Sequence, residues 1–195
     1  IAVAILKFSG GDERIMALFI TQWKVNGGYV EWIKGLPEIF HGQVWRLFTP
    51  MFIHFGFVHI FFNMLWLRDL GSMIESRESS SRLIFLVLLA AGGSNFAQYA
   101  ITIPAFPALS GGSPSFGGMS GVIYGLLGYI WVRGKLDPAS GLILQKFTVT
   151  MMLAWLVLCM TGLLGSIANL AHFFGLLIGM GCGFVASQFR GHLKS

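Results

Sequence analysis

The chain has 195 residues, of which 55% are hydrophobic and only 11% are charged, and its mean hydropathy is +0.73. Soluble domains carry roughly 25% charged residues, so this composition excludes an ordinary soluble domain and indicates an integral membrane protein. The net charge of +5 does not indicate a nucleic-acid partner, because the basic residues are spread among apolar runs rather than clustered.

The chain opens with the apolar stretch IAVAILKF, residues 1–8. This stretch lacks the basic flank and the cleavage site of a signal peptide, and eight residues are too few to span a bilayer. We expect it to be the end of a truncated first membrane helix. In the long segment that follows, Trp23, Trp32 and Trp45 predict a location partly in the lipid headgroup layer.

Five longer apolar runs predict membrane helices by their length and flanking charge. At about 20 residues per spanning helix, they form with the truncated helix a single all-α, polytopic membrane domain over residues 1–195. The predicted helices cover residues 55–74, 83–101, 118–132, 147–164 and 167–189.

The basic residues predict the orientation of these helices. They lie at the ends of the predicted helices 55–74, 118–132 and 167–189, whereas the connections after 83–101 and 147–164 contain no Lys or Arg. The first loop also carries basic residues, but long segments count for less in this rule. Because basic residues favour the cytoplasmic side, the starts of these three helices are expected to face away from the cytoplasm. The basic residues at these three helix ends are Arg68, Arg77, Arg82, Arg133, Lys135, Lys146, Arg190 and Lys194.

Polar residues occur near the starts of the same three helices, and therefore at one depth. His59 and Asn63 lie in the first helix, Ser120 in the second, and Asn169 and His172 in the third. Polar groups are costly in a bilayer and usually point into a helix bundle or a watery cavity. We therefore expect these residues to form one site.

Glycine spacing predicts which helices meet. Both 118–132 and 167–189 carry a glycine at every fourth position, a pattern that lets helix backbones approach closely in lipid. A close crossing there would place Ser120 beside His172; in a chain with 26 glycines the spacing could also be incidental. The glycines are Gly117, Gly121, Gly125, Gly175, Gly179 and Gly183.

The predicted helix 118–132 is short for a membrane span. From residue 117 to Arg133 it rises only about 24 Å, less than a hydrocarbon core of about 30 Å. Its start should therefore lie below the membrane surface, reached by a loop over residues 102–116 that dips into the bilayer.

This arrangement suits nucleophilic catalysis. Serine becomes a strong nucleophile when a histidine takes its proton, and the free N–H groups of a helix start suit the oxyanion that forms on the attacked carbonyl. His59 and Asn63 share a helix face and can donate hydrogen bonds to that oxyanion. No acid is placed to orient His172, so the residues favour a Ser–His dyad.

Three other interpretations compete with the dyad. GGMSGV differs from the G-x-S-x-G turn of soluble hydrolases, since Val122 replaces the second glycine. A metal site from His54, His59 and His172 lacks Asp or Glu ligands and an HExxH motif. Ser120 alone is compatible with a helix cap, and a lone histidine such as His172 is often a structural residue.

Four motifs in order resemble the rhomboid intramembrane serine proteases. They are WR at 45–46, HFGFVHIFFN at 54–63, GMSG at 118–121 and AHFFGLLIG at 171–179. The segment FGGMSGVIYGLLGYIWVRGKLDPASG, residues 116–141, is similar to the bacterial GlpG-type branch of that family.

The resemblance implies a six-transmembrane-helix bundle with Ser120 as the nucleophile and His172 as the general base. His59, Asn63 and the Ser120 backbone N–H would form the oxyanion hole. Tyr124 would pack against the histidine. The supporting residues expected around the pair are Tyr124, Gly118, Gly121 and Gly175.

The resemblance also assigns roles outside the centre of the site. A hairpin in the first loop would carry Trp45 and Arg46, and Glu75 would help to fix the connection between helices 55–74 and 83–101. Substrates would be membrane-spanning proteins that enter sideways, past Phe62 and Trp155.

The leading hypothesis is thus an intramembrane serine protease that cleaves transmembrane segments of membrane proteins. It implies no cofactor, metal or nucleic acid, and a place in the bacterial inner membrane with the active site open to the periplasmic side. The alternative is a non-catalytic rhomboid-like protein that binds or escorts membrane segments. A channel or transporter is less favoured, because no pair of broken helices occurs in corresponding halves.

Overall fold

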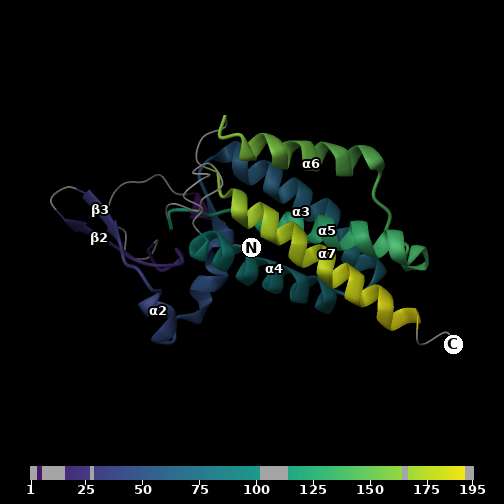
Figure 1. Cartoon of the computed structure of the whole chain (residues 1–195), viewed down its shortest axis with the longest axis horizontal. Helices are drawn as coiled ribbons and strands as arrows, with labels where there is room; N and C mark the ends of the chain where they lie inside the picture. The colour runs from purple at the N-terminus through teal and green to yellow at the C-terminus, as the bar shows by residue number, and fades with distance from the viewer. Residues whose placement is uncertain (1–3, 6–15, 27–28, 102–113, 164–166, 192–195) are drawn as a thin grey trace.

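Five long helices dominate the part of the chain described by the computed structural model, residues 4–5, 16–26, 29–101, 114–163 and 167–191 (Figure 1). Each lies within a few residues of its predicted position, so the all-α class is confirmed. The helices are α3 (Phe57–Arg77), α4 (Ser80–Ala100), α5 (Ser120–Leu136), α6 (Lys146–Met160) and α7 (Asn169–Gly191).

Two boundaries differ from the prediction because of glycine. α5 begins at Ser120 rather than at residue 118, since Gly118 has φ 128, a conformation outside the helical region. α6 ends at Met160 instead of residue 164, because Gly162 takes a left-handed conformation with φ 76 just beyond the helix, which is a common helix stop.

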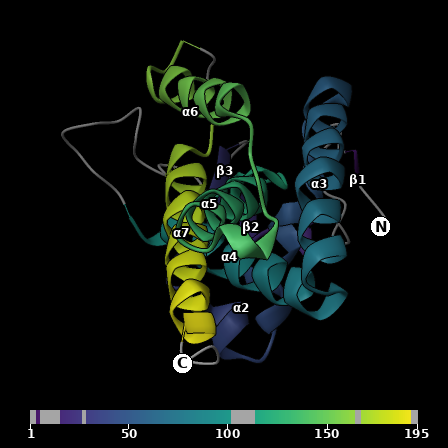
Figure 2. The ribbon, with the colours of Figure 1, turned by 90° about the vertical axis from the view of Figure 1, so that its right-hand side faces the viewer.

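α5 lies at the centre of the bundle. Figure 2 shows it end-on, with α7 on one side and α3 on the other. Every residue from Val122 to Ile130 is buried, and Tyr129, Leu126 and Leu127 are fully enclosed in the main apolar core. The helix that carries Ser120 is therefore the one held most firmly by its neighbours.

α5 and α7 approach through Gly121, Gly125, Gly175 and Gly179, as the spacing predicted. Gly117 was expected on the same ridge, but it precedes α5 and packs against Ile53. A Cβ added to Gly175 would collide with the backbone oxygen of Gly121, and one added to Gly179 with that of Gly125. A Cβ added to Gly183 would likewise lie only 2.7 Å from the backbone oxygen of Tyr129. Only glycine at these positions allows the two backbones to lie this close.

Glu78 links the ends of three helices. It follows α3, and its carboxylate accepts a hydrogen bond from Tyr129 Oη on α5 at 2.6 Å. The same carboxylate forms ion pairs with Arg133 Nε at 3.5 Å and with Arg82 Nε of α4 at 3.4 Å. Glu75, the residue expected at this connection, accepts a hydrogen bond from Ser80 Oγ at 2.6 Å.

The first loop contains a small antiparallel hairpin of β2 (Trp23–Asn26) and β3 (Tyr29–Trp32). Trp23 and Trp32 pair across it with ring centroids 4.9 Å apart. Trp45 and Arg46 were expected in a hairpin, but they lie in the 3-10 helix η1 (Val44–Leu47). That expectation is wrong, because strand pairing follows the aromatic pair in β2 and β3 rather than the WR motif.

Arg46 instead fixes the loop from inside. Its side chain is buried, and Nη1 donates to the backbone oxygens of Met16 at 2.7 Å and Phe19 at 2.9 Å. The described part of the loop also contains the short helices α2 (Pro37–Phe40) and η2 (Thr49–Phe52), and the 3-10 helix η3 (Pro138–Ser140) follows α5.

The N-terminal stretch is not helical where the structure describes it. Ala4–Ile5 form the strand β1, which pairs in parallel with β4 (Ile53–His54). The predicted helix is therefore wrong for these two residues. A short isolated helix is marginal, whereas pairing with β4 satisfies backbone groups of both segments. The rest of residues 1–8, and residues 102–113 of the predicted dipping loop, lie outside the described residues.

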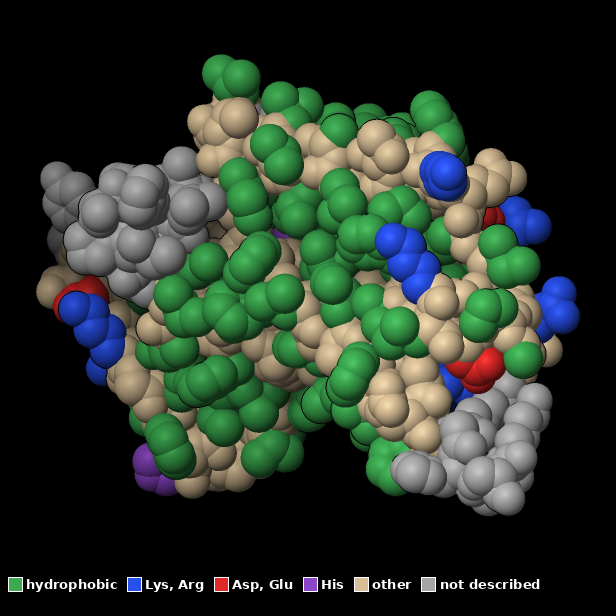
Figure 3. Space-filling view, turned by 45° about the vertical axis from the view of Figure 1, so that its right-hand side comes forward, with side chains coloured by type: hydrophobic (Ala, Val, Ile, Leu, Met, Phe, Trp, Pro, Cys, Tyr) green, Lys and Arg blue, Asp and Glu red, His purple; other side chains and the backbone are tan. Residues whose placement is uncertain are grey.

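Two of the described helices are long and apolar enough to cross a membrane, judged by length and composition: Ser80–Ala100 and Asn169–Phe189. α6 is apolar but has 15 residues, and α5 has 17. α3 carries Arg68, Asp69 and Glu75 within its length. Hydrophobic side chains nevertheless cover the middle of the face seen in Figure 3, with most charged side chains toward its two ends.

Candidate active site

Ser120 and His172 are hydrogen-bonded. Ser120 is the first residue of α5, and His172 lies in the first turn of α7. His172 Nε2 lies 2.6 Å from Ser120 Oγ, within the range of a short O–H···N hydrogen bond. A neutral imidazole with an unprotonated Nε2 accepts the serine proton in this geometry, which is the arrangement of an activated nucleophile.

The helix contact places this pair. Ser120 immediately precedes Gly121, which packs against Gly175 one turn beyond His172. α4 supports both helices: a Cβ on Gly121 would meet Ser94 Oγ at 2.6 Å, and Gln98 Oε1 accepts from the backbone N–H of Ala171 at 2.9 Å. Neither Ser94 nor Gln98 was predicted from the sequence, although both are polar residues in the mainly apolar second half of α4.

Tyr124 lies under the histidine. Its ring centroid is 5.1 Å from that of His172, with the planes tilted by 35°. Its hydroxyl donates to the backbone oxygen of Met152 in α6 at 2.9 Å. Tyr124 thus restricts the imidazole on one side and joins α6 to the bundle on the other. Nδ1 of His172 is buried and has no hydrogen-bond partner among the described residues.

His59 faces the serine from α3. A Cβ on Gly118 would lie 2.7 Å from His59 Nε2 and 3.7 Å from Ser120 Oγ, so both groups face the same glycine. The backbone N–H of Phe55 lies 3.4 Å from Nδ1 of His59. Because Nδ1 accepts this bond, the neutral ring carries its proton on Nε2, where it can donate toward the space beside Ser120.

Asn63 lies one turn along the same face of α3 and is buried. Its Nδ2 donates to the backbone oxygen of His59 at 2.8 Å, which uses one of its two N–H groups and fixes the amide. The second N–H remains for another acceptor.

His54 is near the site but not in the pair. Its side chain is fully buried, its ring centroid lies 4.9 Å from that of His59, and Nε2 has no partner among the described residues. The metal site considered from the sequence needs His54, His59 and His172 together. The described part of the chain gathers no group of three His, Cys, Asp or Glu side chains suited to a metal ion.

Residues 41–189 match the family model of the Rhomboid domain. This match covers most of the chain, including all the residues of the candidate site. The chain belongs to the rhomboid family. The hydrogen-bonded serine and histidine of this rhomboid thus stand where its two glycine-packed helices begin.

Curated relatives of this rhomboid include proteins named Rhomboid protease GlpG from Salmonella paratyphi A, Salmonella newport and Salmonella typhi. Each is 40% identical over 144 residues, which is 73% of this chain and 49% of the relative. The chain therefore spans about half the length of the curated relatives that it matches.

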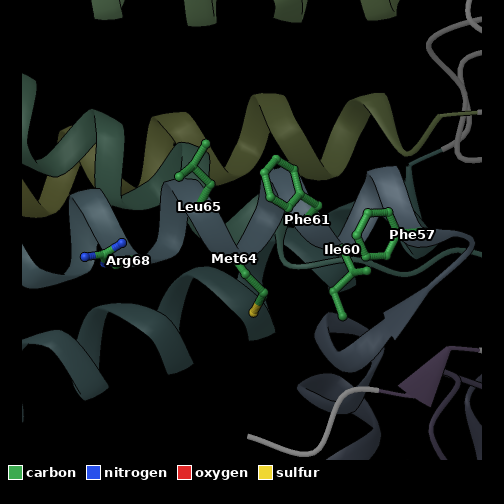
Figure 4. A pocket seen from close by; sticks show the side chains of 6 residues that line it. All are labelled: Phe57, Ile60, Phe61, Met64, Leu65 and Arg68. Atoms are coloured by element: carbon green, nitrogen blue, oxygen red, sulfur yellow. The ribbon is translucent and has the colours of Figure 1, made fainter.

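An open groove lies apart from these residues, along the outer face of α3 (Figure 4). It has a volume of about 420 Å³ and contains none of the site residues. Its lining is apolar except at one end: Phe57, Ile60, Phe61, Met64, Leu65 and Arg68.

Proposed function

We propose that this rhomboid is an intramembrane serine protease that hydrolyses peptide bonds in the transmembrane segments of other membrane proteins. The observation that carries the proposal is the 2.6 Å contact between His172 Nε2 and Ser120 Oγ. The family and the names of the curated relatives support the same activity.

In the proposed reaction, His172 Nε2 takes the hydroxyl proton of Ser120 while Oγ attacks the carbonyl carbon of the substrate. The C=O electrons move to oxygen and form a tetrahedral oxyanion. His172 then gives its proton to the leaving amine as the C–N bond breaks, which leaves an acyl ester on Ser120. A water molecule, deprotonated by His172, attacks the ester, and the proton returns to Ser120 when the acid departs.

Three donors are proposed for the oxyanion: the Ser120 backbone N–H, His59 Nε2 and the second N–H of Asn63. The start of α5 supplies a backbone N–H without an intrahelical partner. Because Nδ1 of His59 accepts the hydrogen bond from the backbone N–H of Phe55, the neutral ring carries its proton on Nε2, which faces Gly118. Donors held in place before the reaction stabilise the developing charge without reorganisation.

The membrane arrangement is part of the same proposal. A single domain over residues 1–195 would belong to a six-helix membrane bundle. The site would open to the periplasmic side of a bacterial inner membrane. Substrates would enter between α3 and α6, where Phe62 and Trp155 are both about half exposed.

Labelling by a fluorophosphonate tests the activity directly, because this reagent reacts with an activated serine. The wild-type protein in detergent should become labelled, and Ser120→Ala should not. A folded wild-type protein that resists labelling would favour the alternative, a non-catalytic rhomboid-like protein that binds or escorts membrane segments.

The oxyanion assignment predicts a specific effect of Asn63→Ala. Loss of one oxyanion donor should lower kcat by about 10- to 1000-fold and change KM little, because the oxyanion exists only after the attack. Steady-state kinetics on a model membrane substrate measure both constants. A large rise in KM with kcat preserved would make Asn63 a binding residue instead.

A further inference from the structure

A second apolar cluster lies outside the main core and joins four parts of the chain. Ile20, Leu36 and Phe116 form its buried centre, and Ile39, Tyr99 and Ala168 pack against it. Three of these residues come from the first loop, and Tyr99 comes from the last turn of α4. The remaining two come from the segments that lead into α5 and α7.

Those two segments enter the helices of the candidate site. Phe116 lies a few residues before Ser120, and Ala168 lies a few residues before His172. The segment after Phe116 is also held from its other side, since the backbone N–H of Gly118 donates to the backbone oxygen of Pro50 at 3.0 Å. A shift of the cluster would therefore move the start of α5, and with it Ser120.

Leu36 is held in an unusual backbone conformation inside this cluster. Its φ of 55 is left-handed, and it is the single residue other than glycine with positive φ in the described part of the chain. Its side chain is only 6% exposed. A strained conformation of this kind persists where the surroundings fix it, and such positions often serve a functional site.

α4 connects the loop to α7 through two consecutive residues. The hydroxyl of Tyr99 accepts a hydrogen bond from the backbone N–H of Gly35 at 2.9 Å, directly before Leu36. Its neighbour Gln98 accepts from the backbone N–H of Ala171 at 2.9 Å, directly before His172. The end of α4 thus ties the left-handed turn of the loop to the start of the histidine helix.

We propose that the first loop positions the Ser120–His172 pair through Leu36 and Tyr99, which makes these two side chains positioning residues. The proposal rests on the protease function proposed above. It assigns to the loop a role in setting the distance between Ser120 Oγ and His172 Nε2.

Leu36→Ala tests this proposal, with Phe40→Ala as the matched control. Phe40 belongs to the same loop but is 84% exposed. Both variants and the wild type are compared below their melting temperatures by fluorophosphonate labelling and by kinetics on a membrane substrate. Leu36→Ala should lower the labelling rate and kcat by about 10-fold, since displacement of a catalytic pair by about 1 Å can cost on the order of 100-fold, with KM unchanged. Phe40→Ala should match the wild type.

Two further variants separate positioning from packing. Leu36→Met conserves the side-chain volume, so its labelling rate and kcat should be close to those of the wild type. Tyr99→Phe removes the hydroxyl that accepts the hydrogen bond from Gly35 and should lower both quantities. If Leu36→Ala has a lower melting temperature but labels and turns over at the wild-type rate while folded, the cluster only stabilises the protein and the proposal is wrong.

A second measurement distinguishes this proposal from the proposed function. If the wild type neither labels nor cleaves, the protease function fails. Positioning is then decided by the ¹⁵N NMR signal of the His172 imidazole, which reports the hydrogen bond between Nε2 and Ser120. That bond should weaken in Leu36→Ala and persist in Phe40→Ala; an unchanged signal in Leu36→Ala overturns the proposal.

Discussion

Ser120→Ala and His172→Ala should each reduce cleavage of a model membrane substrate by at least about 1000-fold, because a nucleophile and its base act as one unit. The two groups are 2.6 Å apart, and neither has another described partner that could replace the lost one. The double variant should be no worse than either single variant. Rates from a gel or fluorescence cleavage assay, with circular dichroism as a folding check, measure these effects.

Ser187→Ala and His41→Ala are the controls for the dyad. They remove a hydroxyl and an imidazole elsewhere in the chain: Ser187 Oγ bonds within α7 to the backbone oxygen of Gly183, and His41 is exposed in the first loop. Both should retain wild-type turnover. Substantial turnover in His172→Ala would remove His172 as the base, and labelling of Ser120→Ala would remove Ser120 as the nucleophile.

Gly179→Val should lower both the stability and the reactivity of the protein, although Gly179 contacts no reacting group. A side chain there would collide with the backbone oxygen of Gly125, so the strain cannot be relieved by turning a neighbouring side chain. Overpacking costs roughly 1–3 kcal/mol of unfolding free energy. Separation of α5 and α7 by about 1 Å can cost on the order of 100-fold in rate. Thermal unfolding and the fluorophosphonate labelling rate measure the two effects.

Gly181→Val provides the matched control on the same helix. A Cβ at Gly181 would meet nothing within 4 Å, so this variant carries the same helix propensity change without the collision. It should keep the melting temperature and labelling rate close to those of the wild type. Equal behaviour of the two variants would mean that α5 and α7 do not depend on this glycine contact.

Local sequence determined the five helices and the contact between two of them. Apolar runs bounded by polar or charged residues place helices wherever they occur, because backbone hydrogen bonds must be satisfied within an apolar segment. The spacing of Gly121 and Gly125 against Gly175 and Gly179 predicted a close contact, since small residues at every fourth position form one ridge of a helix. From that contact alone, Ser120 was expected beside His172, and the structure has them hydrogen-bonded.

The two acidic residues near the end of α3 show what a local pattern does not determine. Glu75 and Glu78 lie close together in the sequence, and only Glu75 was expected to fix the connection to α4. α3 ends at Arg77, and Glu78 leaves the helix with φ −122 and ψ −77. Its carboxylate therefore points to Tyr129 and Arg133 of α5. The position at which α3 ends therefore determines that Glu78, rather than Glu75, contacts α5.

Contacts between segments far apart in the chain were determined by the tertiary structure and were not predicted from the sequence. Ala4–Ile5 pair with a strand almost fifty residues away, Gln98 bonds to Ala171, and Leu36 joins Phe116 in the second apolar cluster. Each contact joins segments far apart in the chain, and it depends on the direction in which a side chain or strand edge points after the helices have packed. Periodicity and composition describe residues that are neighbours in sequence, so they specify the helices and their apolar or glycine-lined faces. Which loop residues contact one another is determined only when the helices pack through those faces.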